Sequence, residues 1–218
     1  MYFDMTYLYI VLPAVIFALI ASGRVKSTFN KYSKQLSASH ISGAQAAQRV
    51  LYLNGLTNTR IERIAGNLTD HYDPKENVIR LSSPVYDSTS TAAIGVACHE
   101  AGHALQYAQG YAPIKLRAAI IPATNIGSKL AMPLVILGII MSYYAQAFIS
   151  VAYIGIIFFT ACVFFQLVTL PVEFNASRRA LQSIEGQGML NEEELKGSRR
   201  VLTAAAMTYV AALAVSLA

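Results

Sequence analysis

The chain has 218 residues, of which 55% are hydrophobic and only 13% are charged. An ordinary soluble domain has about 25% charged residues, so this composition argues against a soluble protein and indicates a membrane protein. The net charge is +5, but the basic residues are scattered without a basic run, which argues against a nucleic-acid partner. Two cysteines, Cys98 and Cys162, are too few for a disulfide framework, and we interpret both as reduced, buried thiols.

The first expected element is a membrane-spanning helix within residues 1–23, which contain the apolar run YLYIVLPAVIFALIA. A cleaved signal peptide begins with basic residues, but only Asp4 is charged before this run. The positive charges follow the run instead, beginning with Arg24 and Lys26. We therefore predict an uncleaved span whose N-terminus lies outside the cell.

Residues 24–129 are predicted to form a small α+β catalytic region. Ser42 and Gln45 have the spacing of a capping box, and Gly55 follows as a stop signal, so a helix is expected between them. Short β-prone pieces flank the turn-rich DPKEN, which predicts one or more hairpins that end near Leu81.

The stretch TAAIGVACHEAGHALQYAQG is predicted to be a helix that begins near residues 88–90 and stops at Gly110. On this helix His99 and His103 lie one turn apart on the same face, so both imidazoles can bind one metal ion. Glu100 is rotated by about 100° and can act as a general base beside the metal, as in the H-E-x-x-H arrangement. The alternative is a pair of core histidines, which would both need buried hydrogen-bond partners.

Residues 130–170 are apolar apart from the short SYYAQAF, and 41 residues suit two membrane crossings rather than one. We place these spans at Leu130–Tyr144 and Phe148–Leu170. Residues 201–218 are uncharged and just long enough for a fourth span. The alternative, that some of these runs are buried soluble helices, leaves too little sequence to cover their apolar surface.

With four spans, all 17 lysines and arginines fall in residues 24–129 and 171–200, on one side of the bilayer. The positive-inside rule makes that side cytoplasmic. We therefore expect a multi-pass protein of the cell membrane that is mostly α-helical. About four transmembrane helices would carry a small α+β zincin-like unit, with a short β-hairpin or sheet, on the cytoplasmic face.

A catalytic zinc site takes three protein ligands and one water molecule, so the two histidines need a third partner. Glu173 is the best candidate, because it directly follows the third span in LPVEFNASRRAL. Ala176 and Ala180 would share its helix face and allow close packing against the histidine helix. The remaining histidines, His40 and His71, and several other carboxylates compete for the role.

Two motifs, HEAGHALQ and EFNAS, resemble the membrane zinc metallopeptidases of the HtpX type, whose third ligand is the glutamate of an E-x-x-A-D pattern. Glu173 and Ala176 match this pattern, but Ser177 stands where aspartate is usual, which weakens the transfer of that aspartate's supporting role but leaves the ligand assignment intact. Over most of the chain, LTDHYDPKENVIRLS, AAIGVACHEAGHALQ, YAPIKLRAAIIPATNIGS and PVEFNASRRAL resemble the YugP-like neutral zinc metallopeptidases. This resemblance implies peptidase chemistry with Glu173 as the third ligand.

Four further residues are weaker candidates for contacts with substrate or transition state. His71, in DHYD, could contact substrate or orient a ligand, although a structural role in the turn competes. Arg178 or Arg179 could support a developing oxyanion, or could instead be interfacial charges. Asn175 could act similarly.

The sequence as a whole predicts a zinc-dependent endopeptidase with His99, His103 and Glu173 as ligands of Zn²⁺ and Glu100 as general base. The expected substrates are flexible cytoplasmic or juxtamembrane segments of proteins, and the expected surroundings are the lipid bilayer without nucleic acid. The rival hypothesis is a zinc-binding scaffold or pseudoprotease that acts through partner membrane proteins. The sequence leaves open whether a second copy or another membrane protein binds.

Overall fold

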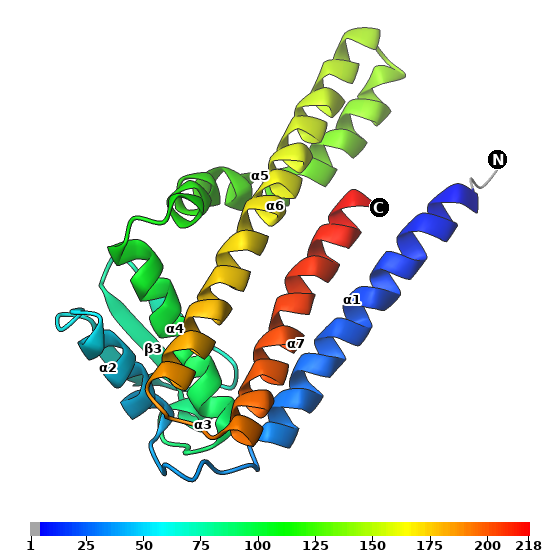
Figure 1. The fold of residues 1–218 in the computed structure, drawn as a ribbon. Helices are drawn as coiled ribbons and strands as arrows, with labels where there is room; N and C mark the ends of the chain where they lie inside the picture. Colours follow the sequence, from blue (N-terminus) through cyan, green and yellow to red (C-terminus); the bar gives the residue numbers. More distant parts are fainter. Residues whose placement is uncertain (1–4) are drawn as a thin grey trace.

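The computed structural model describes residues 5–218, which are mostly α-helical with one small sheet (Figure 1). Asp4 and the beginning of the first predicted span lie outside the described residues. Four helices are long and apolar enough to cross a membrane. These are α1 (Met5–Tyr32), α5 (Ala112–Ser142), α6 (Ile149–Gly186) and α7 (Glu192–Leu217).

The long helices run past the edges of the apolar sequence runs. Helix α1 continues to Tyr32, α5 begins at Ala112, and α6 continues to Gly186. Each of these helices therefore contains both an apolar run and a charged segment at one end. The predicted boundaries between membrane spans and cytoplasmic segments lie at residues 23, 129, 170 and 200. Each boundary falls inside a continuous helix, so the helix ends do not mark it and it stays a prediction.

A sharp turn separates α5 from α6, as expected from SYYAQAF. Helix α5 ends at Ser142, and the short 3-10 helix η1 (Gln146–Phe148) leads into α6. Tyr143 and Tyr144 are 87% and 88% exposed at this turn, which projects from the rest of the protein (Figure 1). Such exposed aromatic residues are typical of a membrane interface.

The sheet contains the expected hairpin and one unexpected strand pairing. Strand β2 (His71–Asp73) pairs antiparallel with β3 (Val78–Ser82), whereas β1 (Arg60–Ile64) pairs with β3 in parallel. The order β1-β3-β2 places β3 in the middle, and four of its five residues are buried. Strand β1 therefore lies on the side of β3 opposite to its hairpin partner β2.

Helix α4 (Thr91–Ala108) is the buried centre of the charged end of the protein. Ser90 caps it by accepting a hydrogen bond from the backbone amide of Ala93. The helix packs against α2 (Gly43–Leu53), α6 and α7, and the short α3 (Ser83–Tyr86) lies beside it. The capping box of Ser42 and Gln45 at the start of α2 is confirmed.

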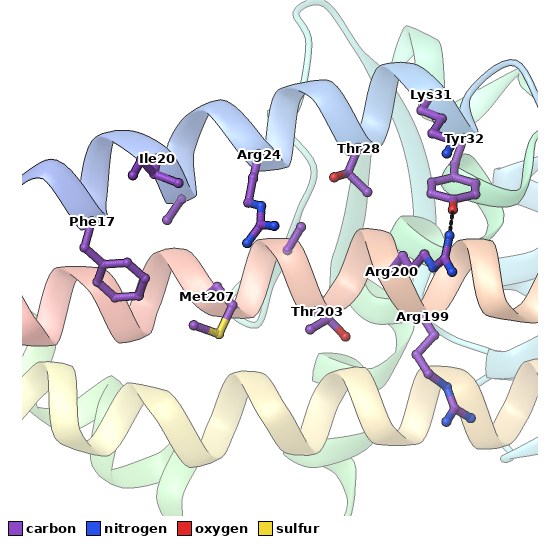
Figure 2. Close-up of a pocket in the computed structure, with 12 residues that line it drawn as sticks. Phe17, Ile20, Arg24, Thr28, Lys31, Tyr32, Arg199, Arg200, Thr203 and Met207 are labelled. Atoms are coloured by element: carbon purple, nitrogen blue, oxygen red, sulfur yellow. Dashed lines mark hydrogen bonds between the residues drawn. The ribbon is translucent and has the colours of Figure 1, made fainter.

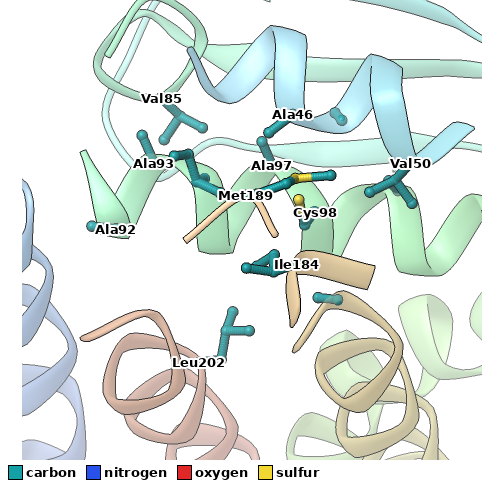
Figure 3. Packing of buried hydrophobic residues seen from close by; sticks show 14 of the residues in the cluster. Ala46, Val50, Val85, Ala92, Ala93, Ala97, Cys98, Ile184, Met189 and Leu202 are labelled. Carbon is teal, nitrogen blue, oxygen red and sulfur yellow. The ribbon is translucent and has the colours of Figure 1, made fainter. Parts of the chain in front are cut away.

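Small side chains let these helices approach one another. Figure 3 shows Ala93 and Ala97 of α4 facing Ala46 of α2, with Ile184 on the opposite side. All four of these residues are completely buried. The alanine-rich sequence of α4 thus produces a helix that is enclosed on most sides and holds its polar residues in fixed positions.

Candidate metal centre

Three side chains from α4 and α6 converge at the middle of the fold. Nε2 of His99 lies 3.2 Å from Oε2 of Glu173, and Nε2 of His103 lies 3.6 Å from the same oxygen. One ligand atom from each residue lies within 4.8 Å of the others. Two atoms bound to one tetrahedral zinc ion at about 2.0–2.1 Å are roughly 3.4 Å apart, so the donor set fits zinc.

Close packing of α4 against α6 makes this convergence possible. A Cβ atom on Gly102 would lie 2.7 Å from the carbonyl oxygen of Ala176 and 3.3 Å from its Cα atom. Only glycine therefore allows the two backbones to come this near. Ala176 and Ala180 are both completely buried, as their proposed place on the packed face requires.

The ring of His103 is oriented by an amide network. Nδ1 of His103 lies 3.0 Å from Oε1 of Gln106, whose Nε2 donates to the carbonyl of Val172 at 2.8 Å and to Oδ1 of Asn175 at 3.0 Å. The amide nitrogen of Gln106 donates both of these hydrogen bonds, so its oxygen faces His103. This oxygen accepts a hydrogen bond from the Nδ1–H group of His103. Nε2 of His103 is then left with a free lone pair towards Glu173.

His99 has a similar support from α6. Its Nδ1 lies 3.1 Å from the hydroxyl oxygen of Ser177, which can accept a hydrogen bond from the ring N–H. Aspartate is usual at this position in the HtpX-type pattern, so the serine weakened the expectation of a supporting role. The serine nevertheless contacts the ring, so both Nε2 atoms can present lone pairs to one ion.

Glu173 is held from a third helix. Nη1 of Arg117, on α5, lies 3.1 Å from Oε1 of Glu173, while Oε2 faces the two histidines. The carboxylate is 3% exposed, so this ion pair is largely shielded from water. Sequence reasoning missed Arg117; the available signal was a single arginine at the amphipathic start of a long apolar helix.

Two cavities border the candidate metal centre. One, of about 400 Å³, lies among α1, α4, α6 and α7, and the other, of about 230 Å³, lies among the hairpin, α4 and α5. His99, Glu100 and Glu173 line both cavities. Tyr209 of α7 also lines both, and nothing in its apolar sequence surroundings marked it in advance. Glu100 is 8% exposed and borders the space in which a substrate could lie.

Asp70 adds a second carboxyl group beside Glu100. It precedes β2, and its Oδ1 accepts hydrogen bonds from the backbone amide of Ser82 at 2.7 Å and from the Ser82 hydroxyl at 3.0 Å. Burial raises the pKa of Asp70, the hydrogen bonds from Ser82 lower it in part, and the charge of Glu100 raises it further. The net effect is a raised pKa.

The electrostatics of His103 reflect two opposing influences. Burial lowers the pKa of His103, whereas its hydrogen bond to Glu173 and the charge of Glu100 raise it. The net shift is upward in the protein without a metal ion. Metal binding requires the neutral imidazole, so a raised pKa makes protonation of this ring compete with metal binding.

The weaker candidates lie at different distances from the converging side chains. His71 lines the smaller cavity, and its Nδ1 lies 2.8 Å from the carbonyl oxygen of Thr69. Asn175 lines neither cavity and instead contacts Gln106, so it supports a ligand rather than facing the substrate space. His40 is exposed in the loop before α2.

Neither arginine that follows Glu173 lines a cavity of the candidate metal centre. Arg178 borders a separate cavity between α6 and α7. Arg179 donates from Nε to Asn175 at 2.7 Å and from Nη1 to Gln109 at 2.5 Å. Five and six residues along a helix rotate a side chain by roughly 140° and 120° away from Glu173, which is why neither faces the substrate space.

Two comparisons with known proteins identify the family of the chain. A family model described as "Putative neutral zinc metallopeptidase" matches residues 7–218. The chain is 46% identical over 213 residues to the "Putative membrane protease YugP" of Bacillus subtilis (strain 168). The aligned residues cover 98% of this chain and 92% of the relative. No solved structure matches. Since the match spans nearly the whole chain, this protein belongs to that family of zinc metallopeptidases.

Proposed function

We propose that the protein is a membrane zinc endopeptidase in which His99, His103 and Glu173 hold Zn²⁺. The observation that carries the proposal is the convergence of these three side chains within 4.8 Å, while Gln106 and Ser177 engage the far nitrogens of the two rings. Zinc bound there would supply Lewis acidity and lower the pKa of a water molecule towards about 7.

Glu100 is the proposed general base. It follows His99 directly on α4 and lines both cavities, so its carboxylate borders the place where water and a peptide carbonyl would meet. A carboxylate in that position accepts the proton of the attacking water and then delivers it to the leaving amine. Its burial keeps bulk water from competing for this proton.

The smaller cavity is the proposed entrance for the peptide. His71 and Tyr72 of β2 line it together with His99 and Glu100. Strand β2 lies at the edge of the sheet, so the described structure leaves one side of its backbone without a strand partner. An extended peptide can pair with such an edge, which would hold it alongside the carboxylate of Glu100.

The proposed orientation places the N-terminus outside and the metal centre on the cytoplasmic side. All 17 lysines and arginines fall within residues 24–129 and 171–200, which lie on one side of the bilayer if the protein has four spans. This distribution supports a cytoplasmic location under the positive-inside rule. The substrates would then be flexible cytoplasmic or juxtamembrane protein segments.

The test compares the wild type with Glu100→Gln and with Glu185→Gln, an exposed carboxylate at the end of α6. Membranes from each strain would be analysed for protein fragments, and each purified full-length protein for zinc. We expect Glu100→Gln to keep about one zinc ion per chain while one or more membrane proteins accumulate uncleaved. Glu185→Gln should match the wild type. Zinc binding with identical protein patterns in all three strains would refute the peptidase and favour the zinc-binding scaffold.

A further inference from the structure

A second cavity region lies between α1 and α7, separate from the metal centre. Figure 2 shows this groove, which has a volume of about 520 Å³. None of its lining residues belongs to the group formed by His99, His103 and Glu173. On α1 the lining residues recur every three or four positions from Phe17 to Tyr32, so they form one continuous face of the helix.

The groove collects positive charge without internal neutralisation. Arg24, Lys31, Arg199 and Arg200 line it, and no aspartate or glutamate does. Within residues 5–218, none of these four side chains forms a salt bridge. Arg200 instead donates from Nη1 to the hydroxyl of Tyr32 at 2.8 Å, which links the two helices. The groove is therefore prepared for an anion from outside the protein.

The charge lies in the middle and at one end of the groove. Helices α1 and α7 run in opposite directions, so the last turn of α1 lies beside the first turns of α7 (Figure 1). The other end is lined by Phe17, Ile20 and Met207, and Figure 2 shows Arg24 between the two ends, pointing from α1 towards α7. A ligand that fills the groove must therefore be anionic at one end and apolar at the other.

The length of the groove agrees with a single lipid leaflet. Fourteen residues separate Phe17 from Lys31, which is about 21 Å along a helix with a rise of 1.5 Å per residue. Half of a hydrocarbon core of about 30 Å plus one headgroup layer of roughly 6 Å gives a similar length. Both helices are among those long and apolar enough to span the bilayer, so lipid has direct access to the groove.

We propose that this groove binds one anionic phospholipid. Arg24, Lys31 and Arg200 contact the phosphate. One guanidinium group can donate two parallel hydrogen bonds to phosphate oxygens, and basic pockets between membrane helices favour anionic headgroups. The hydroxyl groups of Thr28 and Thr203 line the same region and can donate to phosphate or ester oxygens. An acyl chain lies along the apolar end. This site depends neither on bound zinc nor on peptidase activity.

The binding test uses delipidated full-length protein in detergent and native mass spectrometry. Phosphatidylglycerol and phosphatidylcholine with identical acyl chains would be titrated separately, and glycerol 3-phosphate would be added as a competitor. We expect phosphatidylglycerol to bind at least tenfold more tightly than phosphatidylcholine, with no displacement by the soluble phosphate. Equal binding of the two lipids would overturn the proposal, and displacement by glycerol 3-phosphate would show a site for a soluble phosphate ester.

Matched charge variants test the position of the site. Arg24→Gln removes a charge in the groove, whereas Lys26→Gln removes one from the exposed surface of the same helix outside it. We expect about fivefold weaker phosphatidylglycerol binding for Arg24→Gln and less than twofold for Lys26→Gln. Equal losses would overturn the proposal, because they would indicate attraction to the overall charge alone. If Arg24→Gln does not fold, Lys31→Gln against Lys34→Gln makes the same comparison.

Discussion

Gly102 of α4 and Ala176 of α6 meet so closely that a Cβ atom on the glycine would lie 2.7 Å from the alanine carbonyl oxygen. This contact sets the separation of the two helices that supply His103 and Glu173. The H-E-x-x-H turn alone is therefore not enough to form the three-residue site. Glu173 reaches the two histidines only if the backbones of α4 and α6 can come into contact.

Replacement of Gly102 by alanine tests this dependence. The added methyl group must push α4 and α6 apart, and overpacking of this kind costs about 1–3 kcal/mol of unfolding free energy. We expect Gly102→Ala to lower the unfolding midpoint and to weaken zinc binding. Gly23→Ala is the control, because a Cβ atom there meets nothing within 4 Å. Unchanged zinc affinity in Gly102→Ala would show that the site tolerates a wider helix separation.

Gln106 offers a test of ligand orientation without changing a ligand. Gln106→Leu removes the acceptor for Nδ1 of His103 and leaves the carbonyl of Val172 without this donor. Loss of such supporting hydrogen bonds commonly costs about 10–100-fold in metal affinity, and we expect a rise of this size in the zinc Kd. Competition with a chelator measures it. Gln109→Leu, on the exposed end of the same region, should change the Kd less than twofold. Equal Kd values for the two variants would contradict the orienting role.

The parts of the protein that depend on neighbouring residues could be predicted from the sequence. The capping box of Ser42 and Gln45, the helix with His99 and His103, and the turn before α6 each follow from contacts within a few positions. The convergence of Glu173 with the histidines was also expected, because an apolar run leads directly to Glu173 and small residues share its helix face.

Features that depend on distant segments could not be predicted in the same way. To predict the parallel pairing of β1 with β3, one must know which edge of β3 is free after β2 has paired with it. No local sequence pattern contains this information. Arg117 reaches Glu173 only because α5 packs along α6, and Tyr209 reaches the same place from the last helix. Arg178 and Arg179 were proposed from their nearness in sequence, and helical rotation turns both away.

Cys98 should be chemically inert in the folded protein. It is completely buried on α4, and burial raises its pKa to about 12, so almost none of it is thiolate at neutral pH. In a Cys162→Ala background, where Cys98 is the remaining cysteine, we expect iodoacetamide to label the protein only after unfolding. Mass spectrometry of samples with and without denaturant gives the labelled fraction. Rapid labelling of the folded protein would show that the core around α4 opens readily.

Asp70 and Asp73 should make the stability of the metal-free protein depend on pH in opposite directions. Burial raises the pKa of Asp70 above its unfolded value of 3.8, so its ionised form opposes folding. This penalty is present above the folded pKa and disappears as the pH falls below 3.8. Hydrogen bonds from the Lys75 amide and from Arg80 lower the pKa of Asp73, so its stabilisation is present above 3.8 and is lost as the pH falls through its folded pKa.

Asparagine variants separate these two contributions. With chelator present, Asp70→Asn should raise the unfolding midpoint relative to the wild type at pH 7, and the difference should shrink as the pH approaches 4. Asp73→Asn should lower the midpoint at pH 7, and this difference should persist to about pH 4 and shrink only below 3.8. Thermal unfolding in detergent between pH 7 and about pH 3 measures both contributions. A lower midpoint for Asp70→Asn at pH 7 would mean that the hydrogen bonds from Ser82 outweigh the cost of burying the charge.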